Sequence, residues 1–380
     1  MNWDITGMAA VANIGASPRE IFAALCAGQE SRKPLRAFAP DKYRAAYAYE
    51  IDDRPEGGGD IPRRATRWLT TVIRQAVADA GLGEDLSHVP VLVGTTMREQ
   101  RSLELWWRDH ADVALEDLHF GTALKETFGA STTYTFANAC SATLCALGMA
   151  TDMIELGMAD TVVVAGTDAA TESGFGTLDR VQNDIPDALH PFDATHKGML
   201  MGEGAAAVVV QRAGTGHGPV HARVRGVSMN CDAHHATAPD PDGITSAVID
   251  AYSRAGVRAQ DIDLVMLHGS GTPRNDATES SVLSRIFHGV GTGPRMTAIK
   301  AMTGHTLGGS GLLSLLMAVL AMKEGTVPPV LGLTDPIPEA TGLDLVQGTP
   351  ASGDLTIAQI DAFGFGGINA VAIVEAASQC

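Results

Sequence analysis

The sequence predicts an α/β fold, because short apolar segments that suit β-strands alternate along the chain with segments that suit helices. The candidate strands are rich in valine and isoleucine and are bounded by glycine, aspartate or proline. Continuous apolar runs of this kind are typical of strands in a sheet that is covered on both faces. The predicted strands are residues 89–96, 133–139, 161–169, 205–212, 263–270 and 370–376.

Helical patterns lie between and around these strands. Residues 65–80 predict a helix that ends at Gly81, and residues 242–256 predict an amphipathic helix. Residues 140–157 and 311–323 are apolar nearly all round, which indicates buried helices. These two helices occupy similar places after turns rich in glycine and serine, one in each half of the chain. Their correspondence indicates a duplicated architecture.

Composition and charge exclude several classes of function. The chain has 380 residues, of which 45% are hydrophobic, so it can bury a large core and is not disordered. Forty-two glycines indicate many sites where the backbone closely approaches another backbone or a ligand. Forty-four acidic residues against 27 basic ones give a net charge of −17. This charge disfavours binding to nucleic acid or to an anionic membrane surface.

The cysteines and apolar segments favour a cytoplasmic protein. Five cysteines without a CxxC pair predict neither a disulfide framework nor a structural zinc site. We expect no secretory leader, and the longest apolar stretches, such as residues 312–322, fall short of the ~20 residues that cross a bilayer. The histidine pairs His217/His221 and His234/His235 lack the carboxylate–histidine spacing of a metal site, so no metal is predicted.

Cys140 is the candidate nucleophile. It lies where a predicted buried strand meets an apolar helix, and the helix N-terminus is expected to favour the thiolate, which is the attacking form. Its small neighbours leave room for an acyl group and for the Cys140 N–H to face an oxyanion. A buried structural cysteine is the alternative that position alone leaves open.

Two further turns carry histidines. His268 ends a predicted strand in LHGSGTPRND, and Lys300 and His305 flank a glycine-rich turn in KAMTGHTLGGSG. Two imidazole N–H donors directed at one carbonyl oxygen would stabilise an enolate or an oxyanion. The alternative for either histidine alone is a satisfied core or turn residue. In the segment FGFGGIN, glycines around Phe365 allow close backbone approach, and an N–H of this loop could complete an oxyanion hole; the alternative is a simple tight turn.

The ordered motifs NACSA, HGSGTPRND, K-x-x-x-GH and GFGGIN resemble those of the β-ketoacyl-acyl carrier protein synthases of the thiolase superfamily, most closely the elongating type II branch. The opening ITGMAAVANIG and the segment HPFDATHKGMLMGEGAAAVVV also resemble this family, so the similarity covers nearly the whole chain. The resemblance implies a duplicated, five-layered α-β-α-β-α fold and a homodimer. Residues 1–215 would form the half that carries Cys140, and residues 216–380 the half that carries both histidines and the gate loop.

The resemblance also implies a decarboxylative Claisen condensation in fatty-acid or polyketide synthesis. Cys140 would hold the acyl group as a thioester, and His268 and His305 would bind the malonyl thioester and stabilise its enolate. The N–H groups of Cys140 and Phe365 would form the oxyanion hole. Substrates would arrive on the phosphopantetheine of an acyl carrier protein, with no bound cofactor. The resemblance further implies that Lys300 orients the site through Glu279. Phe365, between Gly364 and Gly366, would act as a gate. Thr237 and Thr272 would contact the pantetheine.

The sequence departs from the family pattern at three places. Ser314 stands where elongating synthases commonly carry a glutamate that partners the lysine, and Ser270 replaces a threonine. His196-Lys197 replaces an arginine and an aspartate. These changes favour a specialised pathway over housekeeping fatty-acid synthesis.

Docking of an acidic carrier protein to an acidic enzyme requires a local basic patch. The candidates are Arg63, Arg64 and Arg67 at a predicted helix start, supported by Lys197. An ordinary solvated helix face is the alternative for any one of them.

Three rival functions remain to be weighed. A non-catalytic partner resembling a chain-length factor typically lacks the nucleophile, whereas Cys140, His268 and His305 are all present; a heterodimer with such a partner stays open. A thiolase would carry a second cysteine near the C-terminal glycine-rich loop, and an acyl-CoA condensing enzyme would share this layout. An esterase would need a GxSxG elbow. The sequence leaves open the acyl chain length, the extender unit and the pathway.

Overall fold

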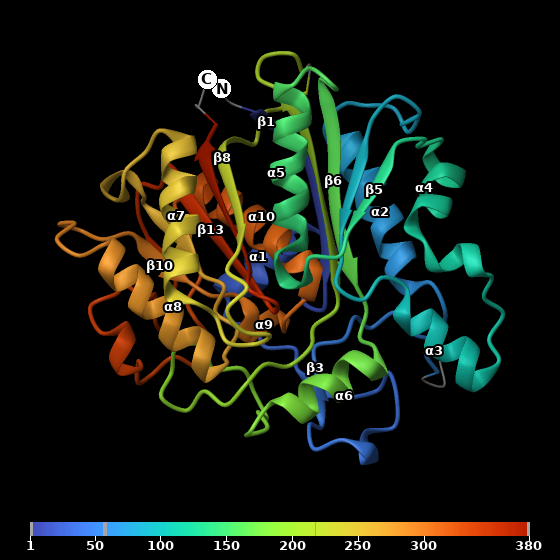
Figure 1. The fold of residues 1–380 in the computed structure, drawn as a ribbon, viewed down its shortest axis with the longest axis horizontal. Helices are drawn as coiled ribbons and strands as arrows, with labels where there is room; N and C mark the ends of the chain where they lie inside the picture. The colour runs from blue at the N-terminus through green and yellow to red at the C-terminus, as the bar shows by residue number, and fades with distance from the viewer. Residues whose placement is uncertain (1–2, 56–58, 217, 378–380) are drawn as a thin grey trace.

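The computed structural model describes residues 3–55, 59–216 and 218–377. Over these residues the main sheet has ten strands (Figure 1). Their spatial order is β10 (Arg295–Thr297), β9 (Leu264–Met266), β13 (Ile357–Gly364), β14 (Ile368–Ala376), β8 (Ala222–Cys231), β1 (Trp3–Ala12), β7 (Gly204–Arg212), β6 (Thr161–Asp168), β4 (Val91–Gly94) and β5 (Thr133–Phe136).

The sheet consists of two halves with the same topology. In the first half, β7 pairs antiparallel with both β1 and β6, while β4 pairs parallel with β6 and β5. In the second half, β14 pairs antiparallel with both β8 and β13, while β9 pairs parallel with β13 and β10. The halves meet where Trp3–Ile5 of β1 pairs with Ala222–Val224 of β8. The predicted duplication is therefore confirmed.

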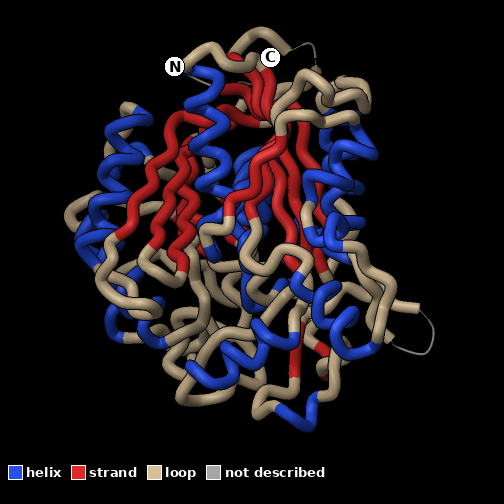
Figure 2. The backbone as a smooth tube through the Cα atoms, turned by 45° about the vertical axis from the view of Figure 1, so that its right-hand side comes forward, coloured by secondary structure: helices blue, strands red, loops and turns tan. Residues whose placement is uncertain are grey.

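Helices form three layers around the two half-sheets. α1 (Pro18–Cys26), α5 (Ala142–Glu155) and α10 (Ser310–Glu324) lie between the halves, in one apolar core that includes strands of both. α2 (Arg64–Asp79) and α4 (Phe120–Phe128) cover the outer face of the first half, and α7 (Pro241–Ala255) and α8 (Pro273–Ile286) cover that of the second (Figures 1 and 2). This is the expected five-layered α-β-α-β-α arrangement.

The remaining elements connect these layers. They are α3 (Gln100–Asp109), α6 (Glu172–Val181), α9 (Lys300–Thr303), the short strand pairs β2 (Lys33–Pro34) with β3 (Tyr47–Ala48) and β11 (Thr326–Val327) with β12 (Ala351–Ser352), and six short 3-10 turns. Two of these turns matter below. η3 (Ala139–Ser141) precedes α5, and η5 (Leu307–Gly309) precedes α10, so the two central helices begin in the same way.

Most of the predicted strands and helices are present, with two differences. β5 was expected to be buried, but it is the last strand of the sheet, and the Tyr134 side chain is 51% exposed. The apolar segment around α10 is also longer than expected. Leu307–Glu324 is long and apolar enough to cross a membrane by composition alone, yet 89% of it is buried inside the protein. We therefore read it as a core helix.

Gly94, the last residue of β4, allows α5 to pack directly against the sheet. A Cβ at this position would lie 2.5 Å from the backbone nitrogen of Thr143 and 2.6 Å from the carbonyl carbon of Ala142. Backbone atoms of a buried helix cannot move aside as a flexible side chain can, so α5 can approach β4 only where the side chain is absent.

We predict that Gly94→Ala lowers the free energy of unfolding by about 1–3 kcal/mol or more, because the added methyl group overpacks this contact. Urea unfolding followed by circular dichroism measures the change. Gly83→Ala is the matched control, since a Cβ there meets nothing within 4 Å. Equal stabilities for the two variants would contradict the assigned contact.

Candidate active site

Cys140 lies in the turn η3, between the edge strand β5 and the N-terminus of α5. The preceding residue, Ala139, has a φ of 49°, a left-handed conformation that turns the chain sharply. The turn is held from the other half of the protein, because the Ser141 hydroxyl lies 2.9 Å from the carbonyl oxygen of Ala362 and 2.6 Å from that of Ile368. These carbonyls belong to the strands on either side of the gate loop, so the nucleophile turn and the gate loop are joined.

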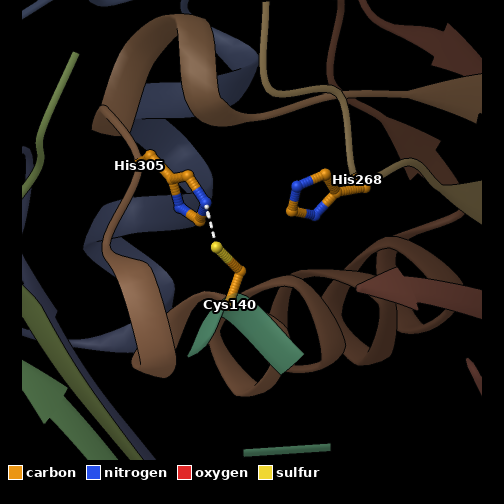
Figure 3. A group of neighbouring side chains, drawn as sticks. All are labelled: Cys140, His268 and His305. Atoms are coloured by element: carbon orange, nitrogen blue, oxygen red, sulfur yellow. Dashed lines mark hydrogen bonds between the residues drawn. The ribbon is translucent and has the colours of Figure 1, made fainter. Parts of the chain in front are cut away.

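His305 points directly at the sulfur. Its Nε2 lies 3.0 Å from Cys140 Sγ (Figure 3). The backbone N–H of Leu307 donates to Nδ1 over 3.2 Å, so Nδ1 accepts and the proton of a neutral ring lies on Nε2. The geometry therefore directs an N–H donor at the sulfur and at any carbonyl bound beside it.

His268 faces the same cavity from the second half of the sheet. Its ring and that of His305 are 5.4 Å apart between centroids and meet edge to face at 77°. One ring nitrogen of each histidine and the Cys140 sulfur all lie within 4.8 Å of one another. His268 is buried, and its Nδ1 has no hydrogen-bond partner. The three side chains thus converge, as Figure 3 shows.

Lys300 and Glu279 hold the His268 backbone from opposite sides. The Lys300 ammonium donates to the His268 carbonyl, while Glu279 accepts the N–H groups of His268 at 2.6 Å and Gly269 at 2.9 Å. The orientation of the site by Lys300 through Glu279 stays a prediction. The two form no salt bridge among the described residues, but both bind the same backbone segment. Burial lowers the pKa of Lys300 and raises that of Glu279, while the Glu279 charge acts to raise the pKa of Lys300.

Burial favours the neutral forms of the thiol and both imidazoles at rest, although the Lys300 charge lies near them. Burial raises the pKa of the Cys140 thiol to about 11, and the Lys300 charge and the Phe365 N–H offset this only in part. Burial, with the Lys300 charge, also holds the pKa values of His268 and His305 well below the usual histidine range. The backbone N–H of Cys140 lowers the thiol pKa, the direction expected for the start of a helix, but the cost of burying a charge outweighs this effect.

The gate loop, residues 363–369, forms part of the lining of the cavity beside the sulfur. Phe365 lies between β13 and β14, followed by Gly366 and Gly367, whose φ values of 86° and 78° are left-handed. A Cβ on Gly367 would come within 2.0 Å of the Asp232 carboxylate, so this tight turn requires glycine. The cavity beside the sulfur has a volume of about 20 Å³, room for one water molecule. An acyl group can therefore enter only if lining side chains move.

The predicted pantetheine contacts, Thr237 and Thr272, line this cavity with Gly364. Seven other lining residues were not predicted as site residues, although Ser270 was noted as a departure from the family pattern. They are Met199, Ala238, Pro239, Ser270, Asn275, Phe363 and Gly367. The sequence could have pointed to them, because they stand in the same motifs, within a few residues of the predicted site residues.

A zinc ion would find three nitrogen and sulfur ligands at this site, but the hydrogen bonding opposes it. A metal needs a lone pair on His305 Nε2, whereas the Leu307 N–H leaves that nitrogen protonated. Among the other histidines considered for metal, His221 pairs with Asp79 at 2.7 Å and His235 Nδ1 accepts the N–H groups of Thr237 and Ala238. His217 lies outside the described residues.

The predicted docking patch is only partly at the surface. Arg63, Arg67 and Lys197 are exposed. Arg64 is 1% exposed and is paired with carboxylates of Asp53, Asp60 and Glu203, so its assignment to the patch was wrong. It faces inward because the first turn of α2 lies against these acidic side chains, and a buried guanidinium needs them.

Comparison with known proteins places these features in one family. Residues 4–215 match the profile of the beta-ketoacyl synthase N-terminal domain, and residues 221–334 match that of its C-terminal domain. The 3-oxoacyl-[acyl-carrier-protein] synthase 2 of Coxiella burnetii is 29% identical, over 98% of this chain and 97% of that protein. The tetracenomycin polyketide synthase ketoacyl synthase alpha subunit of Streptomyces glaucescens is also 29% identical, over 97% and 96%. The solved structure of the ishigamide ketosynthase/chain length factor matches with a TM-score of 0.88 and 28% identity over 99% of both chains.

We predict that iodoacetamide alkylates Cys140 slowly at pH 7 and faster by about tenfold per pH unit up to pH 10, because only the thiolate reacts and the thiol pKa is raised to about 11. Peptide mass spectrometry measures the rate at Cys140, with the exposed Cys231 as internal reference. A rate that levels off below pH 8 would show that the resting site already holds a thiolate.

Proposed function

This chain belongs to the beta-ketoacyl synthase family, and we propose from this premise that it condenses an acyl group held on Cys140 with malonyl-acyl carrier protein. The observation that carries the proposal is the convergence of one buried sulfur and two buried imidazoles, with His305 Nε2 3.0 Å from the sulfur and the two rings 5.4 Å apart. The product would be a β-ketoacyl-acyl carrier protein, with release of CO₂.

In the first half-reaction, the Cys140 sulfur attacks the carbonyl carbon of the incoming acyl thioester. The carbon–sulfur bond to phosphopantetheine breaks, and the thiol proton leaves with the pantetheine thiol. The backbone N–H groups of Cys140 and Phe365 both lower the pKa of the thiol, which supports their assignment as the oxyanion hole. Because burial holds the thiol neutral, proton removal and carbonyl attack must be coupled.

In the second half-reaction, malonyl thioester loses CO₂ while its carbonyl oxygen accepts hydrogen bonds from His268 and His305. The enolate carbon then attacks the acyl carbon on Cys140, a carbon–carbon bond forms, and the released sulfur takes a proton from solvent. Neutral imidazole donors suit this step, because they stabilise developing negative charge without protonating the enolate carbon.

The substrates would bring their own phosphopantetheine, so we propose no resident cofactor, with Thr237 and Thr272 as pantetheine contacts. We place the enzyme in the cytoplasm, which the free thiols of Cys26, Cys140, Cys145 and Cys231 support. The exposed edge strand β5 leaves room for a second subunit. A homodimer is our proposal; pairing with a chain-length-factor-like subunit is its alternative, since a solved relative is named as a ketosynthase/chain length factor.

We predict that incubation with acyl-carrier proteins of graded chain length adds the acyl mass to the wild-type protein and none to Cys140→Ala. Intact-protein mass spectrometry reads the addition and reports the preferred chain length at once. Cys145→Ala, in the buried helix α5 that follows the Cys140 turn, is the matched control and should acylate normally. Acylation of Cys140→Ala, or none of the wild type by carrier-bound or CoA-bound acyl groups, would contradict the proposal. Transfer from acyl-CoA but not from the carrier would support the acyl-CoA rival.

With Arg64 excluded, the exposed cations next to cavity-lining residues are the better docking candidates. Lys197 lies two residues before Met199, and Arg274 lies between Thr272 and Asn275. Neither is in a salt bridge among the residues that the structure describes. Both are therefore free to meet an acidic partner at the mouth of the cavity.

We predict that Lys197→Glu with Arg274→Glu raises the KM for acyl-carrier protein by about tenfold and leaves the KM for acyl-N-acetylcysteamine unchanged. Steady-state kinetics at two salt concentrations test this, because screening by salt should narrow the difference in KM for acyl-carrier protein between the variant and the wild type. Lys125→Glu, on the outer helix α4, is the control. An equal rise for both substrates would place the two cations in the active site itself rather than in docking.

A further inference from the structure

A buried carboxylate that the proposed chemistry does not use lies behind the active site. Asp168 ends strand β6 and is fully buried. Its oxygens accept the Thr95 hydroxyl at 2.8 Å and the backbone N–H groups of Thr96 at 2.9 Å, Met97 at 2.7 Å and Gly308 at 2.8 Å. It forms no salt bridge among the described residues, so hydrogen bonds alone satisfy it.

These hydrogen bonds join two turns from different halves of the protein. Thr95–Met97 follows β4, whereas Gly308 lies in η5, the turn that precedes α10. The turns are in direct contact, because a Cβ on Gly308 would lie 2.5 Å from the Thr95 Cα and 2.7 Å from the Thr96 nitrogen. Asp168 is therefore placed to hold η5 at a fixed distance from the first half-sheet.

η5 in turn controls His305. Leu307, the first residue of η5, has a φ of 50°, and its N–H donates to His305 Nδ1, while the next N–H along the chain, that of Gly308, donates to Asp168. Successive N–H groups of one strained turn thus bind the imidazole and the carboxylate. A shift of Gly308 would also move the Leu307 N–H away from the ring.

We propose that Asp168 is a positioning residue that fixes His305 in the Nε2–H tautomer, oriented toward Cys140, by holding Gly308 and with it the Leu307 N–H. The effect on turnover rests on the proposed role of His305, whereas the tautomer is a property of the resting protein. Asp168 acts through the backbone and touches no reacting atom.

A second effect of Asp168 has the opposite sign. Its negative charge contributes to the raised pKa of Cys140, although less than burial does. Removing that charge should lower the thiol pKa and speed alkylation, even as misplacement of His305 slows decarboxylation. A variant that only loosens the fold would not couple faster alkylation and slower decarboxylation to a change in the His305 tautomer.

The test begins with the wild-type protein labelled with nitrogen-15 histidine. Long-range proton–nitrogen correlation spectra distinguish the two tautomers, and the His305 signal is assigned by its loss in His305→Gln. The expected result is a proton on Nε2. A proton on Nδ1 in the wild type would overturn the proposal without any Asp168 variant.

Asp168→Asn then places an amide NH₂ among four hydrogen-bond donors. We expect the His305 signal to show the Nδ1–H tautomer or exchange between both, a fall of about 10- to 100-fold in kcat for malonyl decarboxylation with KM little changed, and faster alkylation of Cys140. Asp263→Asn is the matched control. Asp263 directly precedes β9, and its carboxylate accepts the backbone N–H groups of Thr356 and Ile357. This variant should leave all three readouts unchanged.

An Asp168→Asn protein with the wild-type tautomer and wild-type decarboxylation would overturn the proposal, as would equal effects from Asp263→Asn. If instead the tautomer changes in Asp168→Asn while the wild type decarboxylates nothing, Asp168 keeps its positioning role and the proposed function fails.

Discussion

The structure depends on the contact of two helix starts across the boundary between duplicated halves. α5 and α10 lie together in the central layer, each preceded by a 3-10 turn, and this brings Cys140 of one half within 3.0 Å of His305 of the other. So close an approach needs missing side chains. A Cβ on Gly166 would come within 2.2 Å of the Thr143 side chain, and one on Gly311 within 2.7 Å of Leu144. Much of the glycine excess in the sequence thus has a local purpose, because these glycines let helix, sheet and catalytic turns share one narrow space.

Close packing also fixes the chemistry. A cavity with room for about one water molecule cannot solvate a thiolate or an imidazolium, so the thiol and both imidazoles are neutral at rest. Such a site reacts little until a substrate supplies a carbonyl for the N–H donors to bind. The hydrogen bonds from Ser141 to carbonyls of Ala362 and Ile368 tie the nucleophile turn to the gate loop, so the backbone that carries the sulfur is joined to the backbone that carries Phe365.

The sequence alone predicted the α/β class, the buried helices and the residues that meet in the cavity, because the nucleophile, both histidines and the gate loop all stand in recognisable local patterns. It could not predict properties that depend on distant pairing. β5 has the composition of an inner strand but forms a sheet edge, and Arg64 has the composition of a surface cation but is enclosed by carboxylates such as Glu203, which is 139 residues away. The raised pKa of Cys140 also depends on distant residues, since the side chains that bury the thiol come from both halves. Asp168 was overlooked because its partners lie on two segments that are far from it in the sequence, Thr95–Met97 and Gly308.

The central claim is that two neutral imidazole donors and one sulfur form a single site. Release of labelled CO₂ from malonyl-acyl carrier protein by Cys140→Ala tests it most directly, because this variant cannot be acylated but keeps both histidines. The account predicts that Cys140→Ala still decarboxylates, and that adding His268→Ala or His305→Ala lowers the rate by about 100- to 1,000-fold, the usual loss for one donor of an oxyanion hole. Undiminished decarboxylation after removal of His268 or of His305 would contradict the account.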